Sequence, residues 1–328
     1  MRKYRKKLLC LLIVLCVCLV PVGHAEASQD RLIPYSLADA KEGASLMLAN
    51  TDYYAGFSQN DLDYKMQNKG AAMEEYRSFA REQVLDFTDE EAALIEAYIA
   101  KMEQKLTEGG LRLPPLEPIT FIQTTMAEEC GAGGYTHGVQ IYLSSELLQG
   151  AVQEPEIYAE FLESLFWHEL FHCLTRCNPD FRADMYRIIR FTVEDEDFPL
   201  PPSVFEYHIS NPDVEHHNAW ASFLIGGEEV KCFTDYITTK HFENPGDMFF
   251  DYGTTALVPV DGSDLYYTPE KASNFDEVFG RNTGYVIDPE ECLADNFALA
   301  LVYGPDGPEG FPYPNPEIIE AILAELKT

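Results

Sequence analysis

The sequence predicts an α+β fold in which a long helix packs beside a small sheet. Apolar residues spaced by three and four predict that helix over 154–176, and β-branched and aromatic residues predict adjacent strands over 119–125 and 135–143. With 328 residues, 46% of them hydrophobic, the chain can bury a large core. Disordered, collagen-like and disulfide-stapled classes of protein are therefore excluded.

The first 27 residues have the pattern of a secretory signal peptide. Five basic residues precede an uncharged run of 13 residues from Leu8 to Val20, and Ala25 and Ala27 are small residues that suit cleavage. The run is shorter than the roughly 20 residues of a membrane-spanning helix. We expect removal of residues 1–27 and a secreted or extracytoplasmic chain, which includes the bacterial cell surface. Retention of the segment as a membrane anchor is the alternative.

The mature chain is strongly acidic. Without residues 1–27 it has 18 basic and 54 acidic side chains, a formal net charge of −36. Such a charge repels nucleic acid and anionic membrane surfaces. No Asp-rich calcium loop is present, so a solvated surface explains the acidity better than a calcium-stabilised adhesin does.

Five cysteines remain in the mature chain, an odd number for an exported protein. Because no paired Cys-x-x-Cys motif is present, the sequence does not indicate a cysteine metal site. Buried thiols, or one or two local disulfides, are the expected states. The five are Cys130, Cys173, Cys177, Cys232 and Cys292.

The region 28–115 is predicted to be mostly helical. Thr88 and Glu91 form a capping-box pattern at the start of one helix, and the glycines at 109 and 110 end it. After the strand at 119–125 and a glycine-rich stretch, apolar side chains stand at alternate positions between Tyr135 and Leu143, which predicts a second strand. If this second strand lies at the edge of the sheet, an extended peptide can pair with it; an ordinary internal strand is the alternative.

The rest of the chain is predicted to complete one domain over 28–328. It includes a mixed, loop-rich insertion over 195–284, in which prolines, aromatic residues and turn dipeptides are frequent. Asp288 and Pro289 are an N-cap and a first-turn proline, which begin a helix after this insertion. The elements are, in order, a helix over 181–191, strands over 219–225 and 229–236, a helix from 289 to about 302 and a last helix over 316–327.

The long predicted helix contains an HExxH motif, formed by His168, Glu169 and His172. Two histidines four residues apart lie on one helix face, so both imidazoles can reach a single cation, and the glutamate can reach a water on the open side of that cation. Two ordinary surface histidines are the alternative. The apolar residues around the motif favour buried histidines that need partners.

A catalytic zinc site needs a third protein ligand, and Glu291 is the candidate. Asp295 lies one turn further along the same predicted helix, where its carboxylate can accept the free N–H of a metal-bound imidazole. A second interpretation is that Glu291 completes a capping box with Asp288. The metzincin extension is excluded, since Thr175 and Asn178 replace its glycine and third histidine.

The HExxH motif and the later Glu-x-x-x-Asp pair resemble the gluzincin arm of the zincin metallopeptidases, the thermolysin-like arrangement. The stretches HELFHCLTRCNPDFR, ISNPDVEHHN and IDPEECLADNFALAL also resemble uncharacterised exported bacterial HExxH proteins. The resemblance implies a zincin-like fold, with His168, His172 and Glu291 as zinc ligands and Glu169 as general base. It also implies that Asp295 is the hydrogen-bond partner of a ligating histidine.

The chain departs from thermolysin-like enzymes in one respect, because Glu291 follows His172 by 119 positions, a much longer interval. His208, His216 and His217 are therefore rival candidates for the third ligand. Residues that can donate a hydrogen bond to the transition state are Tyr285, His216 and His217.

These observations predict a secreted zinc-dependent metallopeptidase that hydrolyses a peptide or protein substrate. A zinc-activated water would attack the peptide bond, with Glu169 as the general base. The alternative is a non-catalytic exported binding module on a zincin scaffold. Retention of Glu169 favours the enzyme, since a structural zinc site has no need of that residue.

Overall fold

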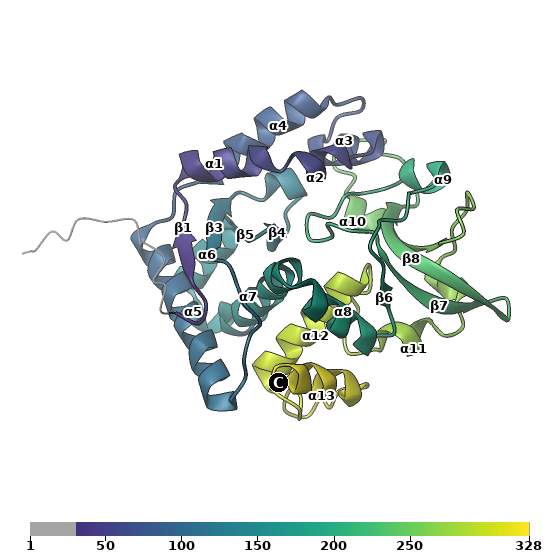
Figure 1. The fold of residues 1–328 in the computed structure, drawn as a ribbon. Coiled ribbons are helices and arrows are strands. Elements are labelled where there is room, and N and C mark those ends of the chain that lie inside the picture. Colours follow the sequence, from purple (N-terminus) through teal and green to yellow (C-terminus); the bar gives the residue numbers. More distant parts are fainter. Residues whose placement is uncertain (1–30, 328) are drawn as a thin grey trace, which may run out of the picture.

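The computed structural model describes residues 31–327, so the predicted signal peptide lies outside the described part of the chain. The structure is of mixed α+β type, as the sequence predicts, with helices around two sheets (Figure 1). Within residues 31–327, no helix has both the length and the apolar character needed to cross a membrane. The α-helices are α1 (Ala40–Ala49), α2 (Thr51–Ala55), α3 (Gln59–Met66), α4 (Met73–Glu82), α5 (Asp89–Gly109), α6 (Ser145–Gln153), α7 (Pro155–Cys177), α8 (Pro179–Ile188), α9 (Pro202–Phe205), α10 (Phe249–Tyr252), α11 (Phe275–Phe279), α12 (Pro289–Tyr303) and α13 (Pro316–Glu325). The strands are β1 (Tyr35–Leu37), β2 (Val84–Leu85), β3 (Ile119–Thr124), β4 (Gly134–His137), β5 (Gln140–Ser144), β6 (Thr192–Val193), β7 (Ala219–Ile225), β8 (Glu228–Thr238) and β9 (Gly253–Pro259).

The first sheet has the strand order β1-β3-β5-β4, and the short strand β2 also pairs with β3. β3 runs parallel to β1 and β5, whereas β4 runs antiparallel to β5. Because side chains alternate along a strand, Phe121 and Ile141 face the core that contains α7, and Ile122 and Tyr142 face the helices α1 and α4. The sheet therefore lies between α1 and α4 on one face and α7 on the other (Figure 1).

The prediction of one strand over 135–143 is wrong in one respect, because two strands form a hairpin there. Gly138 lies at the turn between β4 and β5 and has a φ of 56°. This left-handed conformation reverses the chain and suits glycine, which lacks a Cβ atom. The turn makes β4 the edge of the sheet.

The long helix α7 agrees closely with the predicted helix. Leu162, Leu170 and Leu174 are buried in the core, but Ile157 and Phe161, which the same pattern places on an apolar face, are 70% and 53% exposed. Within residues 31–327, the start of α7 is therefore less covered than its second half, which packs against α12. α12 packs along α7 with the Phe297 ring 5.3 Å from the Phe171 ring.

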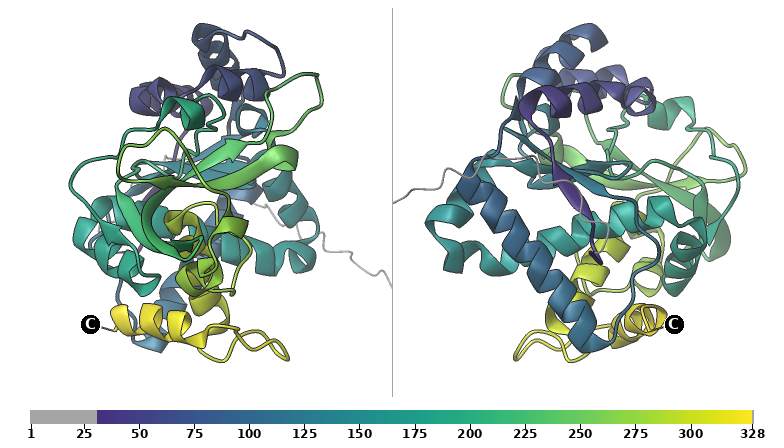
Figure 2. Two further views of the ribbon diagram at one scale, coloured as in Figure 1. Left: turned by 90° about the vertical axis from the view of Figure 1, so that its right-hand side faces the viewer. Right: turned by 60° about the vertical axis from the view of Figure 1, so that its left-hand side comes forward.

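A second sheet has the strand order β6-β7-β8-β9 with all neighbours antiparallel, and β7, β8 and β9 lie within the region 195–284. The strands predicted at 219–225 and 229–236 are present, and β9 was not predicted. One face of this sheet joins the main core through Ala221 and Phe223. Figure 2 shows the sheet, in green, between the N-terminal helices above and α13 below.

Other local predictions vary in accuracy. The Thr88–Glu91 capping box begins α5, and Gly110 ends it in a left-handed conformation. β1 and α6 were not predicted. All five cysteines of the described chain are free thiols, of which Cys173, Cys232 and Cys292 are buried.

Candidate metal centre

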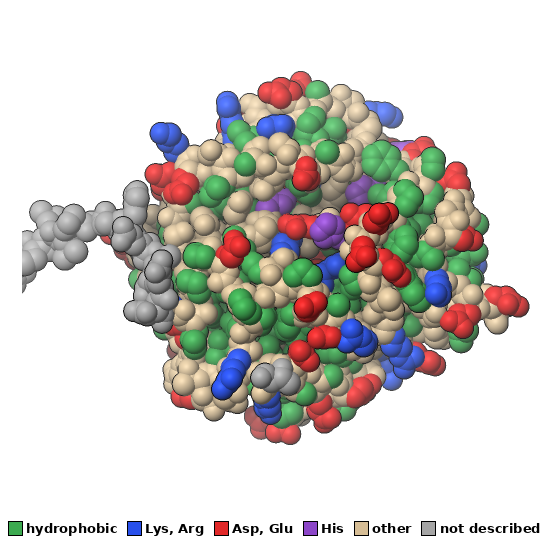
Figure 3. Space-filling model, in the orientation of Figure 1, with side chains coloured by type: hydrophobic (Ala, Val, Ile, Leu, Met, Phe, Trp, Pro, Cys, Tyr) green, Lys and Arg blue, Asp and Glu red, His purple; other side chains and the backbone are tan. Residues whose placement is uncertain are grey.

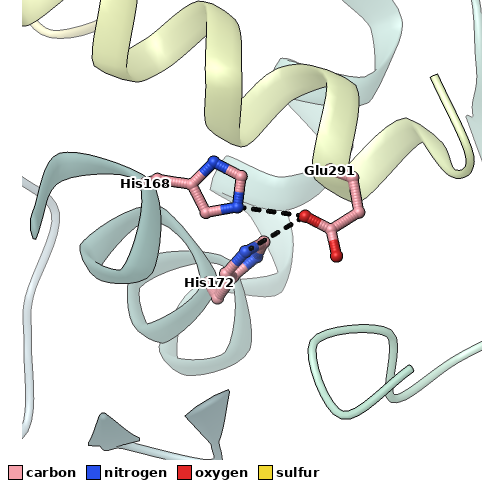
Figure 4. Close-up of side chains that lie close together, drawn as sticks. All are labelled: His168, His172 and Glu291. Atoms are coloured by element: carbon pink, nitrogen blue, oxygen red, sulfur yellow. Dashed lines mark hydrogen bonds and ion pairs between the residues drawn. The ribbon is translucent and has the colours of Figure 1, made fainter. Parts of the chain in front are cut away.

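The crossing of α7 and α12 brings the three predicted ligands together. His168 Nε2 lies 3.0 Å from Glu291 Oε2, and His172 Nε2 lies 3.6 Å from the same oxygen. One ligand atom from each residue lies within 4.8 Å of the other two. Both rings project from α7 towards the Glu291 carboxylate on α12 (Figure 4).

The start of α12 decides between the two interpretations of Glu291. The Asp288 side chain caps the helix by accepting a hydrogen bond of 2.8 Å from the Glu290 N–H. The Glu291 carboxylate faces the two histidines instead, and its Oε1 accepts a hydrogen bond from the Asn211 side chain. Glu291 is therefore available as a ligand and does not complete a capping box.

Two carboxylates orient the histidines from behind. Asp295 Oδ1 lies 2.9 Å from His168 Nδ1, as the sequence predicts. Glu290 Oε1 lies 3.1 Å from His172 Nδ1, which the sequence analysis missed. Hydrogen bonds from Thr175, at 2.6 Å, and from the Tyr186 hydroxyl, at 2.7 Å, hold the Glu290 carboxylate. An Nδ1–H bonded to a carboxylate leaves Nε2 of each ring free to bind a cation.

The predicted general base, Glu169, is buried beside the histidines, and its Oε2 has no hydrogen-bond partner in the described chain. β4 approaches it closely at Gly134, where a Cβ atom would lie 2.7 Å from Glu169 Oε1. Burial raises the pKa of Glu169 to about 8, and the negative charge of Asp213 contributes to that rise. A carboxylate of this kind can accept and release a proton near neutral pH.

Asp213 is the second residue of the site that the sequence analysis missed. A second group of potential ligands consists of the Asp213 carboxylate, the Glu169 carboxylate and the His172 ring. One ligand atom of each lies within 4.8 Å of the others. Asp213 Oδ1 lies 4.0 Å from His172 Nε2. In the sequence, Asp213 is only an acidic residue that follows Asn211-Pro212. Nothing in this local pattern predicts that it contacts α7.

The donor set suits a divalent cation. Five carboxylates, those of Glu169, Asp213, Glu290, Glu291 and Asp295, surround two imidazoles, so negative charge is in excess. His172 Nε2 and Glu169 Oε2 are buried without a hydrogen-bond partner within residues 31–327. Two imidazole nitrogens and one carboxylate oxygen are a common ligand set for catalytic zinc. The residues therefore fit a zinc ion held by His168, His172 and Glu291.

The three rival histidines lie away from this group. His208 Nδ1 and His217 Nε2 lie 2.8 Å and 3.1 Å from Asp235 Oδ1, and His216 forms an exposed ion pair with Asp197. Within residues 31–327, neither His216 nor His217 has a hydrogen bond or ion pair to His168, His172 or Glu291, and their role as transition-state donors stays a prediction. Figure 3 shows histidine side chains near the middle of one face, beside acidic side chains.

Tyr285, the other predicted donor, lies at the edge of the candidate centre. Its hydroxyl is 3.5 Å from Glu291 Oε1, and its ring centre is 6.2 Å from that of His168. The side chain is 39% exposed, more than any of the predicted ligands. A phenol in this position can donate a hydrogen bond to a ligand that enters from solvent.

The His217–Asp235 pair predicts a pH-dependent stability. Burial lowers the pKa of His217, but the hydrogen bond with Asp235 raises it above its usual value of 6.5, whereas Asp235 has a pKa of about 2 and stays ionised. The ion pair therefore stabilises the fold fully below pH 6.5, and this contribution is lost as the pH rises through the raised pKa. We expect His217→Ala to lower the free energy of unfolding by about 1.5–3 kcal/mol at pH 6 and by less at pH 9.

Urea unfolding of wild type and variant at the two pH values measures this difference. His216→Ala is the matched control, because exposed ion pairs contribute little. An equal loss at pH 6 and pH 9 for His217→Ala would contradict the prediction.

The chain matches no protein-family model, and comparisons with curated proteins and with solved structures gave no match either.

Proposed function

We propose that this chain is an exported zinc-dependent metallopeptidase of the zincin type, with the gluzincin ligand set. The convergence of His168, His172 and Glu291 carries the proposal, since one ligand atom of each lies within 4.8 Å of the others. These residues come from two helices that are far apart in the sequence. The signal-peptide pattern supports export, and the acidic charge argues against nucleic-acid or membrane partners.

Each residue of the site has a role that follows from its position. When bound, zinc supplies Lewis acidity, which acidifies water and polarises a peptide carbonyl. Glu169 accepts the proton of the attacking water on its unpartnered Oε2 and delivers it to the leaving amine. Asp295 and Glu290 hold the two imidazoles by their Nδ1 atoms. The products are a carboxylate and an amine, with no covalent intermediate on the protein.

Two measurements on the purified chain test this proposal together. We expect about one zinc per chain by elemental mass spectrometry. Hydrolysis of a mixed peptide library, followed by mass spectrometry, should stop when 1,10-phenanthroline removes the metal and should return when zinc is added. A well-folded chain without zinc would contradict the proposal.

Zinc binding without hydrolysis of any peptide would favour the alternative, a non-catalytic binding module on the same scaffold. The unpartnered Glu169 carboxylate argues against that alternative, because a buried polar atom without a partner is costly unless it has a use.

A further inference from the structure

A short segment, Asn211–Glu215, crosses the candidate metal centre on the side of the general base; we refer to it as the 211–215 segment. Its first residue binds Glu291, and its third residue, Asp213, lies beside His172. Pro212 and Asp213 are buried, whereas Glu215 reaches the surface. The segment thus runs from the third ligand, past the histidine, to solvent.

Asp213 lies on the same side of His172 as the candidate general base. It shares a group of potential ligand atoms with Glu169 and His172, and Glu169 is the residue positioned to act on a water. A carboxylate oxygen is also a regular zinc ligand. His172 Nε2, which has no hydrogen-bond partner in the described chain, faces both Glu291 Oε2 at 3.6 Å and Asp213 Oδ1 at 4.0 Å.

The same segment covers the outer edge of β4. Thr136 donates its backbone N–H and its hydroxyl to Asp213 Oδ1, at 2.7 Å and 2.6 Å. Gly138 donates its N–H to Glu215 Oε1 at 2.9 Å. An extended peptide that pairs with an edge strand uses outward-facing N–H groups of this kind. The 211–215 segment therefore occupies donors that a substrate peptide would need.

The segment also separates two cavities of about 520 Å³ and 430 Å³. Val214, Glu215 and His216 line both of them. Glu169, His172 and Glu291 are each at most 2% exposed, so neither cavity reaches the three of them. Asn211, which contacts Glu291, lines the first cavity, and Asp213, which lies beside His172, lines the second.

We propose that Asp213 is a fourth protein ligand of the same cation and that the 211–215 segment closes the site against substrate. The inference rests on the proposed zinc site. A zinc ion with four protein ligands has the closed arrangement of structural sites, whereas catalysis requires an open position. Hydrolysis then requires the segment to withdraw Asp213 from His172 and to free the N–H groups of Thr136 and Gly138.

Arg176 holds the segment closed. Its guanidinium donates to the carbonyl oxygens of Pro212 and Asp213, at 3.1 Å and 2.9 Å, and pairs with Glu215 at 2.9 Å. These bonds join the segment to the last turn of α7, the helix that carries the HExxH motif. Opening of the segment must break them, which makes the closed state the more stable one without substrate.

The experiment compares wild type, Asp213→Asn and Glu215→Gln, each loaded with cobalt in place of zinc. Asparagine keeps an oxygen that can accept from Thr136 but is a poor ligand, so Asp213→Asn should fold and change the visible absorption spectrum of the cobalt. Acetohydroxamate, which binds an open metal position, should bind this variant at least about tenfold more tightly than wild type, because Asp213 no longer occupies the fourth position of the metal. Glu215→Gln should leave the cobalt spectrum of the free protein unchanged, since Glu215 is not a member of the ligand group.

Two outcomes would overturn the inference, and they are distinguishable. If wild type and Asp213→Asn bind cobalt with the same spectrum and the same acetohydroxamate affinity, Asp213 is not a ligand and the proposed function stands. If wild type binds no cobalt or zinc while it is folded by circular dichroism, both the proposed function and this inference fail.

Discussion

Glu169→Gln should lower the rate of peptide hydrolysis by about 10²–10⁴-fold and leave the zinc content at about one per chain. Glutamine has the shape of glutamate but cannot accept the proton of the attacking water. It also fits the same space beside Gly134, where β4 lies close to the side chain. The fold and the ligands His168 and His172 should therefore be unaffected.

Steady-state kinetics and elemental mass spectrometry on the same preparations provide the measurement. Glu160→Gln is the matched control, because Glu160 lies on α7, is exposed and contacts Tyr303 rather than the site. This control should retain wild-type activity. Full activity in Glu169→Gln would show that another group takes the proton and would refute the proposed mechanism.

Glu291→Ala should abolish stoichiometric zinc binding and, with it, hydrolysis. The substitution removes one of three ligands. The apparent affinity for zinc should therefore fall by more than the roughly 10–100-fold that is typical when a residue that hydrogen-bonds to a ligand is substituted. The N-cap of α12 is Asp288, which the substitution leaves in place, and we therefore expect the helix to form. Zinc titration against a competing chelator measures the affinity, and circular dichroism checks the fold.

Glu290→Gln and Asp295→Asn are the matched comparisons for Glu291→Ala. Each alters a carboxylate on the same helix that contacts a histidine Nδ1, so each should weaken zinc binding by about 10–100-fold without abolishing it. If Glu291→Ala binds zinc as tightly as wild type, the assignment of the third ligand is wrong. Asp213 is then the next residue to substitute, since the rival histidines at 208, 216 and 217 lie elsewhere.

Local sequence pattern was sufficient for the elements that have strong local signals. The Thr88–Glu91 capping box, the apolar spacing of α7 and the N-cap at Asp288 each depend on residues within one or two turns, and each is present. The two histidines and the glutamate of the HExxH motif belong to the same category, because four-residue spacing on a helix fixes their common face. A contact of Asp295 with one of the two ligating histidines was also predicted, and the structure identifies that histidine as His168.

Pattern alone misjudged the elements whose form depends on partners. The stretch 135–143 alternates as a single strand would, but the left-handed Gly138 divides it into a hairpin. Ile157 and Phe161 continue the apolar face of α7, but no other element covers them fully. Within the region 195–284, β7 and β8 were predicted, but β9 and the packing of the sheet on the main core were not.

The sequence by itself determined the chemistry that is available: an HExxH helix, a later acidic helix and a strongly acidic chain. Only the tertiary structure decided which of the many carboxylates and histidines meet. Glu290 and Asp213 lie behind and beside His172, whereas His208 and His217 share Asp235. The physical reason is that contacts between residues far apart in the chain depend on how α7, α12 and the 211–215 segment pack, and no local spacing encodes that packing.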